Sequence, residues 1–127
     1  VQLPSGRRLS YVEPRLIPDE RNRKRIYYMG MDQKSHKWRM LLNYVGMLSV
    51  NFVQSVARDC LANAILVVDS CGYQICFHIH DEVVLEILEG GEQSLEDAVR
   101  LMCQAPSWAA GLPLNADGFE GDYYKKE

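Results

Sequence analysis

The sequence lacks the features that mark several broad classes of protein. No run of 18 or more apolar residues is present, so we expect no transmembrane helix. The first ten residues lack the charged and then apolar plan of a signal peptide. No CxxC pair occurs among the four cysteines, which favours buried, reduced thiols in a cytoplasmic protein. The 127 residues suffice for one globular domain but not two, so we expect a single domain over 1–127.

Positive charge is scarce after residue 39. Residues 1–39 carry ten Lys and Arg against four acids, a net charge of +6, whereas residues 40–127 carry four against thirteen, a net charge of −9. Such an asymmetry is a recognised sign of binding to a polyanion. Taken alone, a run of charges is more typical of a solvated loop, so both interpretations stay open. The densest run supplies the basic segment, which consists of Arg21, Arg23, Lys24 and Arg25.

The first third of the chain is typical of strands joined by turns. Residues 4–6 predict a turn before a short strand, and residues 17–25 are expected to be a charged loop. Residues 26–31 are β-prone and aromatic, which predicts the first arm of a hairpin. The turn of this hairpin is DQKSH at 32–36, and the second arm is expected from Lys37 onward.

Residues 49–69 carry the strongest helix signal. Apolar side chains recur there at intervals of three and four, and Ser49 is a plausible N-cap. Gly72 follows the pattern and suits the left-handed residue that commonly ends a helix. The polar residues of this segment share the opposite face of the predicted helix, and they are Asn51, Gln54, Ser55, Arg58 and Asp59.

The later residues predict a tight hairpin, a second helix and a final strand. Residues 73–88 form two β-rich arms around a two-residue loop. Residues 94–104 show an apolar stripe at helical spacing and are stopped by Pro106. Residues 105–126 are expected to be a Gly/Pro-rich loop followed by a strand. Hairpins without βαβ units predict an α+β fold, in which an antiparallel sheet carries two main helices on one face.

The tip of the second hairpin holds His80, Asp81 and Glu82, and three interpretations compete for it. The first is a polar turn, although the pair Asp81-Glu82 lacks the Gly or Asn favoured in two-residue loops. The second is a zinc site, because Cys76, His78 and His80 alternate along one strand. The third is a magnesium site, in which a stiff hairpin holds carboxylates beside a phosphate.

Four segments occur along the chain in this order: LPSGRRLSY, NFVQSVARDCLA, HIHDEVVLEI and GLPLNADGFEGDYYKK. Their order and spacing resemble the phage-encoded branch of the family-A DNA polymerases, which are related to DNA polymerase I. The motif that completes the palm active site of that family has a His-Asp-Glu core, as HIHDEVV does here. The resemblance covers nearly all 127 residues. It implies the C-terminal part of a palm, encoded by a phage or prophage and acting in the cytoplasm of a bacterial host.

The resemblance also implies roles for the residues at the hairpin tip. Asp81 is expected to be a ligand of catalytic Mg²⁺, with Glu82 as a supporting carboxylate for the same metal. His80 is expected near the primer terminus, and the apolar arms are expected to be buried strands. The reaction implied is template-directed nucleotidyl transfer in DNA replication, with primer-template DNA and deoxynucleotides as partners.

Further residues are expected to face nucleic acid. The resemblance matches Gln54 to a glutamine that contacts the duplex in the minor groove, and Asn51 and Arg58 share its helix face. Such contacts sense duplex shape, because the minor groove offers similar acceptors for both orientations of a base pair. The basic segment is expected to contact backbone phosphates in a salt-sensitive, sequence-blind way.

The chain also departs from the family. The first palm aspartate and the fingers helix lie upstream in the family, so we expect a missing N-terminal region and no nucleotide transfer by these residues alone. Val45, Met47 and Val50 stand where the phage branch has Gly, Lys and Glu. Apolar surface exposed on such a fragment would favour a homodimer. The alternatives are a non-catalytic nucleic-acid-binding module and a small zinc-binding protein.

Overall fold

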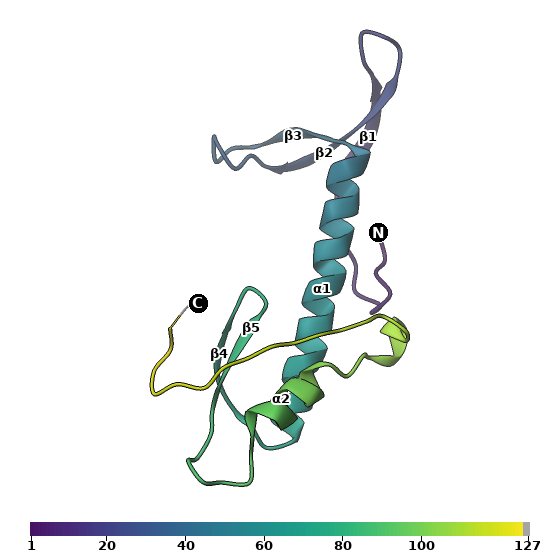
Figure 1. The fold of residues 1–127 in the computed structure, drawn as a ribbon. Coiled ribbons are helices and arrows are strands. Elements are labelled where there is room, and N and C mark those ends of the chain that lie inside the picture. The colour runs from purple at the N-terminus through teal and green to yellow at the C-terminus, as the bar shows by residue number, and fades with distance from the viewer. Residues whose placement is uncertain (126–127) are drawn as a thin grey trace. The chain divides into compact units, whose positions relative to one another are not determined.

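The computed structural model describes residues 1–125, and Figure 1 shows its strands and helices. Two compact units make up the chain, Val1–Val56 and Ala57–Glu127, and the boundary between them falls inside helix α1. The elements in chain order are β1 (Val12–Pro18), β2 (Lys24–Met31), β3 (Trp38–Asn43), α1 (Val45–Ser70), β4 (Gln74–Ile79), β5 (Glu82–Glu86), α2 (Leu95–Met102) and a 3-10 turn (Ser107–Ala109).

The first unit contains a three-stranded sheet with the order β1-β2-β3 and antiparallel pairing. The hairpin predicted for β2 and β3 is confirmed, and its turn is organised by Asp32. The Asp32 carboxylate accepts hydrogen bonds from the backbone N–H of Ser35 at 2.7 Å and of Lys34 at 3.1 Å. The bond from the Ser35 N–H, followed by the Ser35 hydroxyl and the Arg39 guanidinium, lowers the pKa of Asp32 to about 2.

The charged loop predicted over 17–25 is shorter in the structure. Ile17 pairs with Arg25 and Pro18 with Lys24, so the turn that connects β1 to β2 covers only 19–23. The turn is tight because the Asp19 carboxylate accepts hydrogen bonds from backbone N–H groups within it. The prediction was therefore wrong at both ends of the loop, where strand pairing continues.

The two faces of the three-stranded sheet differ in their surroundings. Tyr28 on one face makes an edge-to-face ring contact with Tyr11, with ring centroids 5.1 Å apart. Seven apolar side chains lie together on the opposite face, because directly paired residues of antiparallel strands point the same way. These residues, which we refer to as the apolar sheet face, are Val12, Tyr27, Met29, Met31, Trp38, Met40 and Leu42. Five of them are exposed, with Trp38 at 56% and Met31 at 54%.

Helix α1 begins four residues earlier than the sequence predicts. It starts at Val45, and the Ser49 hydroxyl donates a hydrogen bond to the backbone oxygen of Val45 at 3.0 Å. Ser49 is therefore an interior residue, and its prediction as the N-cap was wrong. Once a helix is nucleated, each added residue gains a hydrogen bond, so the helix extends over the apolar stretch from Val45 to Leu48. Val45 and Val50, two of the departures from the phage branch, are exposed at 75% and 53%.

The end of α1 confirms the sequence prediction. Gly72 has a φ of 85°, in the left-handed region that favours glycine. Its N–H donates to the backbone oxygen of Asp69 at 2.9 Å, and the N–H of Tyr73 donates to the backbone oxygen of Val68 at 3.3 Å. Both bonds are accepted by carbonyl groups of the last turn of the helix, where the helix itself provides too few N–H donors. The chain is thereby turned directly into β4.

The second unit is built around a small core. Val68 from α1, Tyr73 from the following loop, and Ala98 and Leu101 from α2 are buried together. Helix α2 is capped as its sequence favours, since the Ser94 hydroxyl accepts the N–H of Asp97 at 3.2 Å. The helix ends at Met102, two residues before the end of the predicted range. Full burial of a side chain such as Val68 contributes on the order of 1.5–3 kcal/mol to stability.

The final strand predicted within 105–126 is wrong for the part that the structure describes. No strand occurs between α2 and residue 125, and Lys126 lies outside the described residues. Gly118 and Gly121 interrupt the segment, and glycine weakens extended pairing. The segment is held by its side chains instead, through contacts described below.

The α+β class is confirmed, with antiparallel strands and two helices. The strands are divided between a three-stranded sheet in the first unit and the two-stranded hairpin β4–β5 in the second. Across residues 1–125, none of the helices is both long and apolar enough to cross a membrane.

Candidate functional site

The β4–β5 hairpin presents the acidic residues singled out in the sequence. The last pair of its ladder joins Ile79 to Glu82, so the two-residue loop is His80-Asp81. The sequence suggested Asp81-Glu82 as the loop, but Glu82 is the first residue of β5. His80, Asp81 and Glu82 are all exposed. The structure thus places the Asp81 carboxylate at a reversal between paired strands, in contact with solvent.

His80 has a backbone conformation that is uncommon for residues other than glycine. Its φ is 52°, whereas Asp81 is not among the residues with positive φ. A positive φ at the first loop residue alone matches the φ pattern of a type II′ turn, in which glycine normally occupies that position. A non-glycine residue held there costs on the order of 1 kcal/mol or more. The pairing of Ile79 with Glu82 on either side of the loop holds His80 in this conformation.

The two arms of the hairpin are less buried than the resemblance implies. Phe77 and Ile79 in β4 are 40% and 39% exposed, so the expectation of two buried strands was wrong for β4. Val83, Val84 and Leu85 in β5 are half-buried. The strands are partly exposed because the core of the second unit is small. Among the described residues of β4 and β5, only Leu85 packs against this core.

A β-bulge in β4 weakens the zinc interpretation. Ile75 pairs with Leu85 and Phe77 with Val84, so Cys76 is the extra residue in the ladder. His80 lies in the loop rather than in the strand. Cys76, His78 and His80 therefore do not follow the simple alternation on which the zinc hypothesis rests. In residues 1–125 no group of three or more His, Cys, Asp or Glu residues is arranged to hold a metal ion.

Tyr124 joins the C-terminal segment to this hairpin, a contact that sequence reasoning missed. Its hydroxyl donates a hydrogen bond to Oε2 of Glu82 at 3.2 Å. Its ring meets Phe77 edge-to-face, with centroids 5.3 Å apart and an interplanar angle of 78°. Partial loss of hydration, followed by the hydrogen bond to Glu82, raises the pKa of Tyr124 above its ordinary value. No local pattern could have revealed a contact between residues 42 positions apart.

The donor atoms at the hairpin tip suit Mg²⁺ as one part of a binding site. Asp81 and Glu82 offer carboxylate oxygens, which are the ligands that this hard cation takes. Mg²⁺ commonly uses one or two carboxylates and completes its shell with water and substrate phosphates. Two adjacent, exposed carboxylates fit this pattern, whereas a closed site made only of protein ligands would require more groups than the described residues bring together.

The polar residues predicted to face nucleic acid lie on α1, but not all of them are exposed. Gln54 and Arg58 are exposed and accessible to a ligand. Asn51 is half-buried, and its side-chain amide donates a hydrogen bond to the hydroxyl of Tyr11 at 3.1 Å. Asn51 therefore has a structural role within the first unit, as a link between α1 and the segment that precedes β1.

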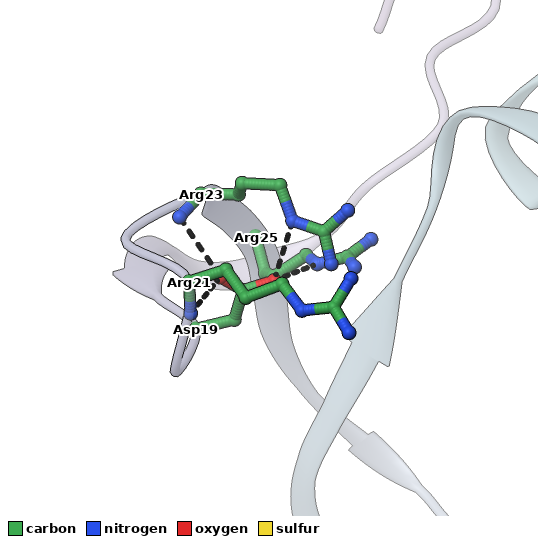
Figure 2. Close-up of polar contacts among 4 residues, drawn as sticks. All are labelled: Asp19, Arg21, Arg23 and Arg25. Atoms are coloured by element: carbon green, nitrogen blue, oxygen red, sulfur yellow. Dashed lines mark hydrogen bonds and ion pairs between the residues drawn. The ribbon is translucent and has the colours of Figure 1, made fainter.

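The basic segment is organised around Asp19, as Figure 2 shows. One oxygen of this carboxylate accepts the backbone N–H of Arg23 at 2.8 Å and that of Arg21 at 2.9 Å. The other accepts Nε of Arg23 at 3.0 Å and Nε of Arg25 at 3.2 Å. Led by the Arg23 backbone bond, these contacts lower the pKa of Asp19 to about 2. A single carboxylate thus brings two guanidinium groups together at the exposed end of the β1–β2 hairpin.

Asp19 was not selected as a functional residue from the sequence. The side chain of an aspartate at the start of a turn often accepts a hydrogen bond from the backbone N–H two residues later. Asp19 stands directly before the polar residues 20–23, so the sequence did contain a signal for this role. Lys24, the fourth member of the basic segment, is exposed in the first position of β2.

Comparisons with known proteins give one clear similarity. No protein-family model matches the chain, and no solved structure matches it. The DNA polymerase of Bacillus phage SP02 is 47% identical to the chain over 127 residues, which is 100% of this chain and 19% of that protein. The chain therefore spans about a fifth of the length of the curated relative it matches. Along its whole length, it is similar to a segment of a phage DNA polymerase.

Proposed function

We propose that the chain is the C-terminal part of the palm of a family-A DNA polymerase, encoded by a phage or prophage and acting in the cytoplasm of a bacterial host. The complete enzyme would carry out template-directed nucleotidyl transfer in DNA replication. The observation that carries this proposal is the exposed Asp81 and Glu82 at a tight hairpin turn, within a chain that is 47% identical throughout to part of a phage DNA polymerase.

In this proposal the hairpin tip supplies part of the catalytic metal site. Asp81 would be a direct ligand of Mg²⁺, and Glu82 would be the supporting carboxylate beside it. When bound, the metal would neutralise charge on the phosphoryl group that is transferred. His80 would lie near the primer terminus. The strained loop favours this role, because a conformation fixed by strand pairing orients these side chains before the substrate arrives.

Helix α1 would contact the duplex near the reacting ends. Gln54 and Arg58 are exposed on this helix, so they are the residues best placed to reach the minor groove. Their contacts would depend on the shape of the duplex and not on its sequence. Asn51 would act mainly by fixing the start of α1 through its hydrogen bond to Tyr11.

The basic segment would contact the phosphate backbone. Arg23 and Arg25 are held by Asp19, which fixes their position and offsets part of their charge. Arg21 and Lys24 are exposed beside them. Binding through such groups releases counterions, so affinity for the duplex should fall as salt rises.

The chain by itself would be an incomplete enzyme. Two carboxylates at one turn are only part of a two-metal site, and the residues that grip the nucleotide would come from an N-terminal region of the longer protein. Exposed apolar side chains on the sheet of the first unit agree with a segment that belongs to a larger body. We therefore expect no primer extension by the 127 residues alone, with Mg²⁺ and all four deoxynucleotides present.

The proposal can be tested in a chimeric polymerase. The segment of the SP02 DNA polymerase that matches this chain is replaced by these 127 residues, and primer extension is measured with Mg²⁺. The chimera should extend the primer. Asp81→Asn should lower the rate by about 10²–10³-fold, the usual effect of removing one group that stabilises the transition state. Binding of primer-template duplex, measured by fluorescence anisotropy, should change little.

Asp69→Asn is the matched control for this experiment. Asp69 is an exposed aspartate near the end of α1, and the same chemical change there should leave extension unchanged. An inactive chimera that still binds duplex would contradict the proposal and favour a non-catalytic nucleic-acid-binding module. Equal rates for Asp81→Asn and Asp69→Asn would remove Asp81 from the catalytic site.

A further inference from the structure

The C-terminal segment contacts the candidate site through Tyr124, which makes both a ring contact and a hydrogen bond. The Tyr124 ring packs on Phe77 of β4, and the Tyr124 hydroxyl reaches Glu82 at the start of β5. Phe77 and Glu82 lie on the two strands of the same hairpin, on either side of the loop. The ring contact therefore fixes where the hydroxyl is, and the hydroxyl fixes the carboxylate.

From this geometry we infer that Tyr124 is a positioning residue, which orients the Glu82 carboxylate so that it supports a divalent cation bound at Asp81. The inference deepens the proposed function and rests on it. It concerns a residue outside the His-Asp-Glu motif, 42 positions along the chain from Glu82.

The chemistry of a carboxylate explains why one hydrogen bond can matter. An ionised carboxylate has two oxygens and accepts bonds only, so a donor on one oxygen restricts rotation and leaves the other for a cation. Tyr124 occupies Oε2, and within the described part of the chain Oε1 accepts no hydrogen bond. Partners of this kind behind a metal ligand typically change metal affinity or activity by 10–100-fold when they are removed.

The contact itself is tested first, on the 127-residue chain and without any metal. The ring signals of Tyr124 are followed by NMR at one neutral pH. Glu82→Gln removes the negative charge beside the hydroxyl and keeps the ring contact with Phe77, so the signal of the Tyr124 ring carbon next to the hydroxyl should shift. An unchanged signal in Glu82→Gln would overturn the inference, because the hydroxyl would then not contact this carboxylate.

Cation binding is tested next, with Mn²⁺ as the probe. Mn²⁺ should broaden the backbone NMR signals of residues 80–82 in the unaltered chain. Tyr124→Phe keeps the ring on Phe77 but removes the hydroxyl, and it should weaken Mn²⁺ binding about 10-fold. Tyr123→Phe is the matched control, since Tyr123 is 74% exposed, and it should bind Mn²⁺ like the unaltered chain.

A double-mutant cycle separates positioning from a general effect on folding. Tyr124→Phe should have no further effect on Mn²⁺ binding when Glu82 is already Gln, because the partner of the hydroxyl is no longer a charged ligand. Equal Mn²⁺ affinity for Tyr124→Phe and the unaltered chain would overturn the inference and leave the polymerase proposal standing. Absence of Mn²⁺ broadening at residues 80–82 would also overturn the inference about Tyr124. The primer-extension experiment with the chimera tests the polymerase proposal separately.

Discussion

At the scale of single residues, His80 shows how a functional position can conflict with stability. Its φ of 52° lies in the left-handed region that favours glycine over residues with a Cβ atom, so the loop carries strain. Natural proteins keep such residues where the geometry serves a purpose other than stability. The neighbouring carboxylates and the proposed position near the primer terminus supply such a purpose.

His80→Gly should not destabilise the chain and should raise its free energy of unfolding by up to about 1 kcal/mol, because glycine adopts this conformation without strain. His80→Val should lower the same free energy by about 1–2 kcal/mol, since a β-branched residue is least tolerated at positive φ. Urea denaturation followed by circular dichroism measures both. If His80→Gly is less stable than the unaltered chain, His80 is not strained. In the chimeric polymerase, His80→Gly should extend primers more slowly, because the histidine side chain is lost from the site.

The sequence predicted the residues at the hairpin tip but not Tyr124, which contacts them. His80, Asp81 and Glu82 could be located because a polar cluster between two β-prone arms is a local pattern. The loop was placed one residue late, because the strained conformation of His80 contradicts the ordinary preference for Gly or Asn. Tyr124 could not be found, because its contact with Glu82 depends on how a segment without regular structure returns to the hairpin.

At the scale of elements, the predictions succeeded where one local cause dominates. The turn at Asp32 and the glycine at Gly72 each fix an end of a strand or helix through nearby hydrogen bonds. The prediction failed at Ser49, because a residue suited to a cap also fits inside a helix that has already begun. It failed for the final strand because β-propensity alone does not supply a partner strand.

The β1–β2 hairpin should depend on pH through Asp19. The folded pKa of this carboxyl is about 2, below the ordinary value of about 3.9, so its bonds stabilise the hairpin above pH ~4. This contribution should be lost as the pH falls through the window from about 4 to about 2. Asp19→Asn cannot ionise, so its β1–β2 signals should change less with pH over that window, as measured by NMR of Ile17 and Arg25.

Asp69→Asn in the second unit is the control for this titration. It should reproduce the pH profile of the unaltered first unit, because it lies outside that unit. An Asp19→Asn chain with the unaltered acid profile would show that the bonds to Arg23 and Arg21 do not stabilise the hairpin. The same variant should release Arg23 and Arg25 from their shared carboxylate, and its duplex binding should become more sensitive to salt.

At the scale of the whole molecule, the first unit exposes a group of large apolar side chains on one face of its sheet. Trp38, Met31 and Leu42 belong to the apolar sheet face and are 56%, 54% and 47% exposed. In the complete polymerase that we propose, neighbouring parts of the protein could cover this face. In the isolated chain the apolar sheet face can be buried against the same face of a second copy. The chain should therefore self-associate through this face.

The self-association can be assigned to one side of the sheet. The combined variant Trp38→Lys, Leu42→Lys places charge on the apolar sheet face and should shift the chain from dimer to monomer in sedimentation velocity over a concentration series. Leu16→Lys is the matched control, because Leu16 is 63% exposed in the same sheet but pairs with Ile26 and so lies on the opposite face.

Salt distinguishes the cause of the association. Burial of apolar side chains is not screened by ions, so added salt should leave the dimer intact, whereas an association driven by the basic segment and the acidic second unit should weaken. A monomer at every concentration, or equal association by the two lysine variants, would contradict the assignment. Since the altered residues lie in the first unit and the hairpin tip in the second, the monomeric variant should still bind Mn²⁺ at residues 80–82.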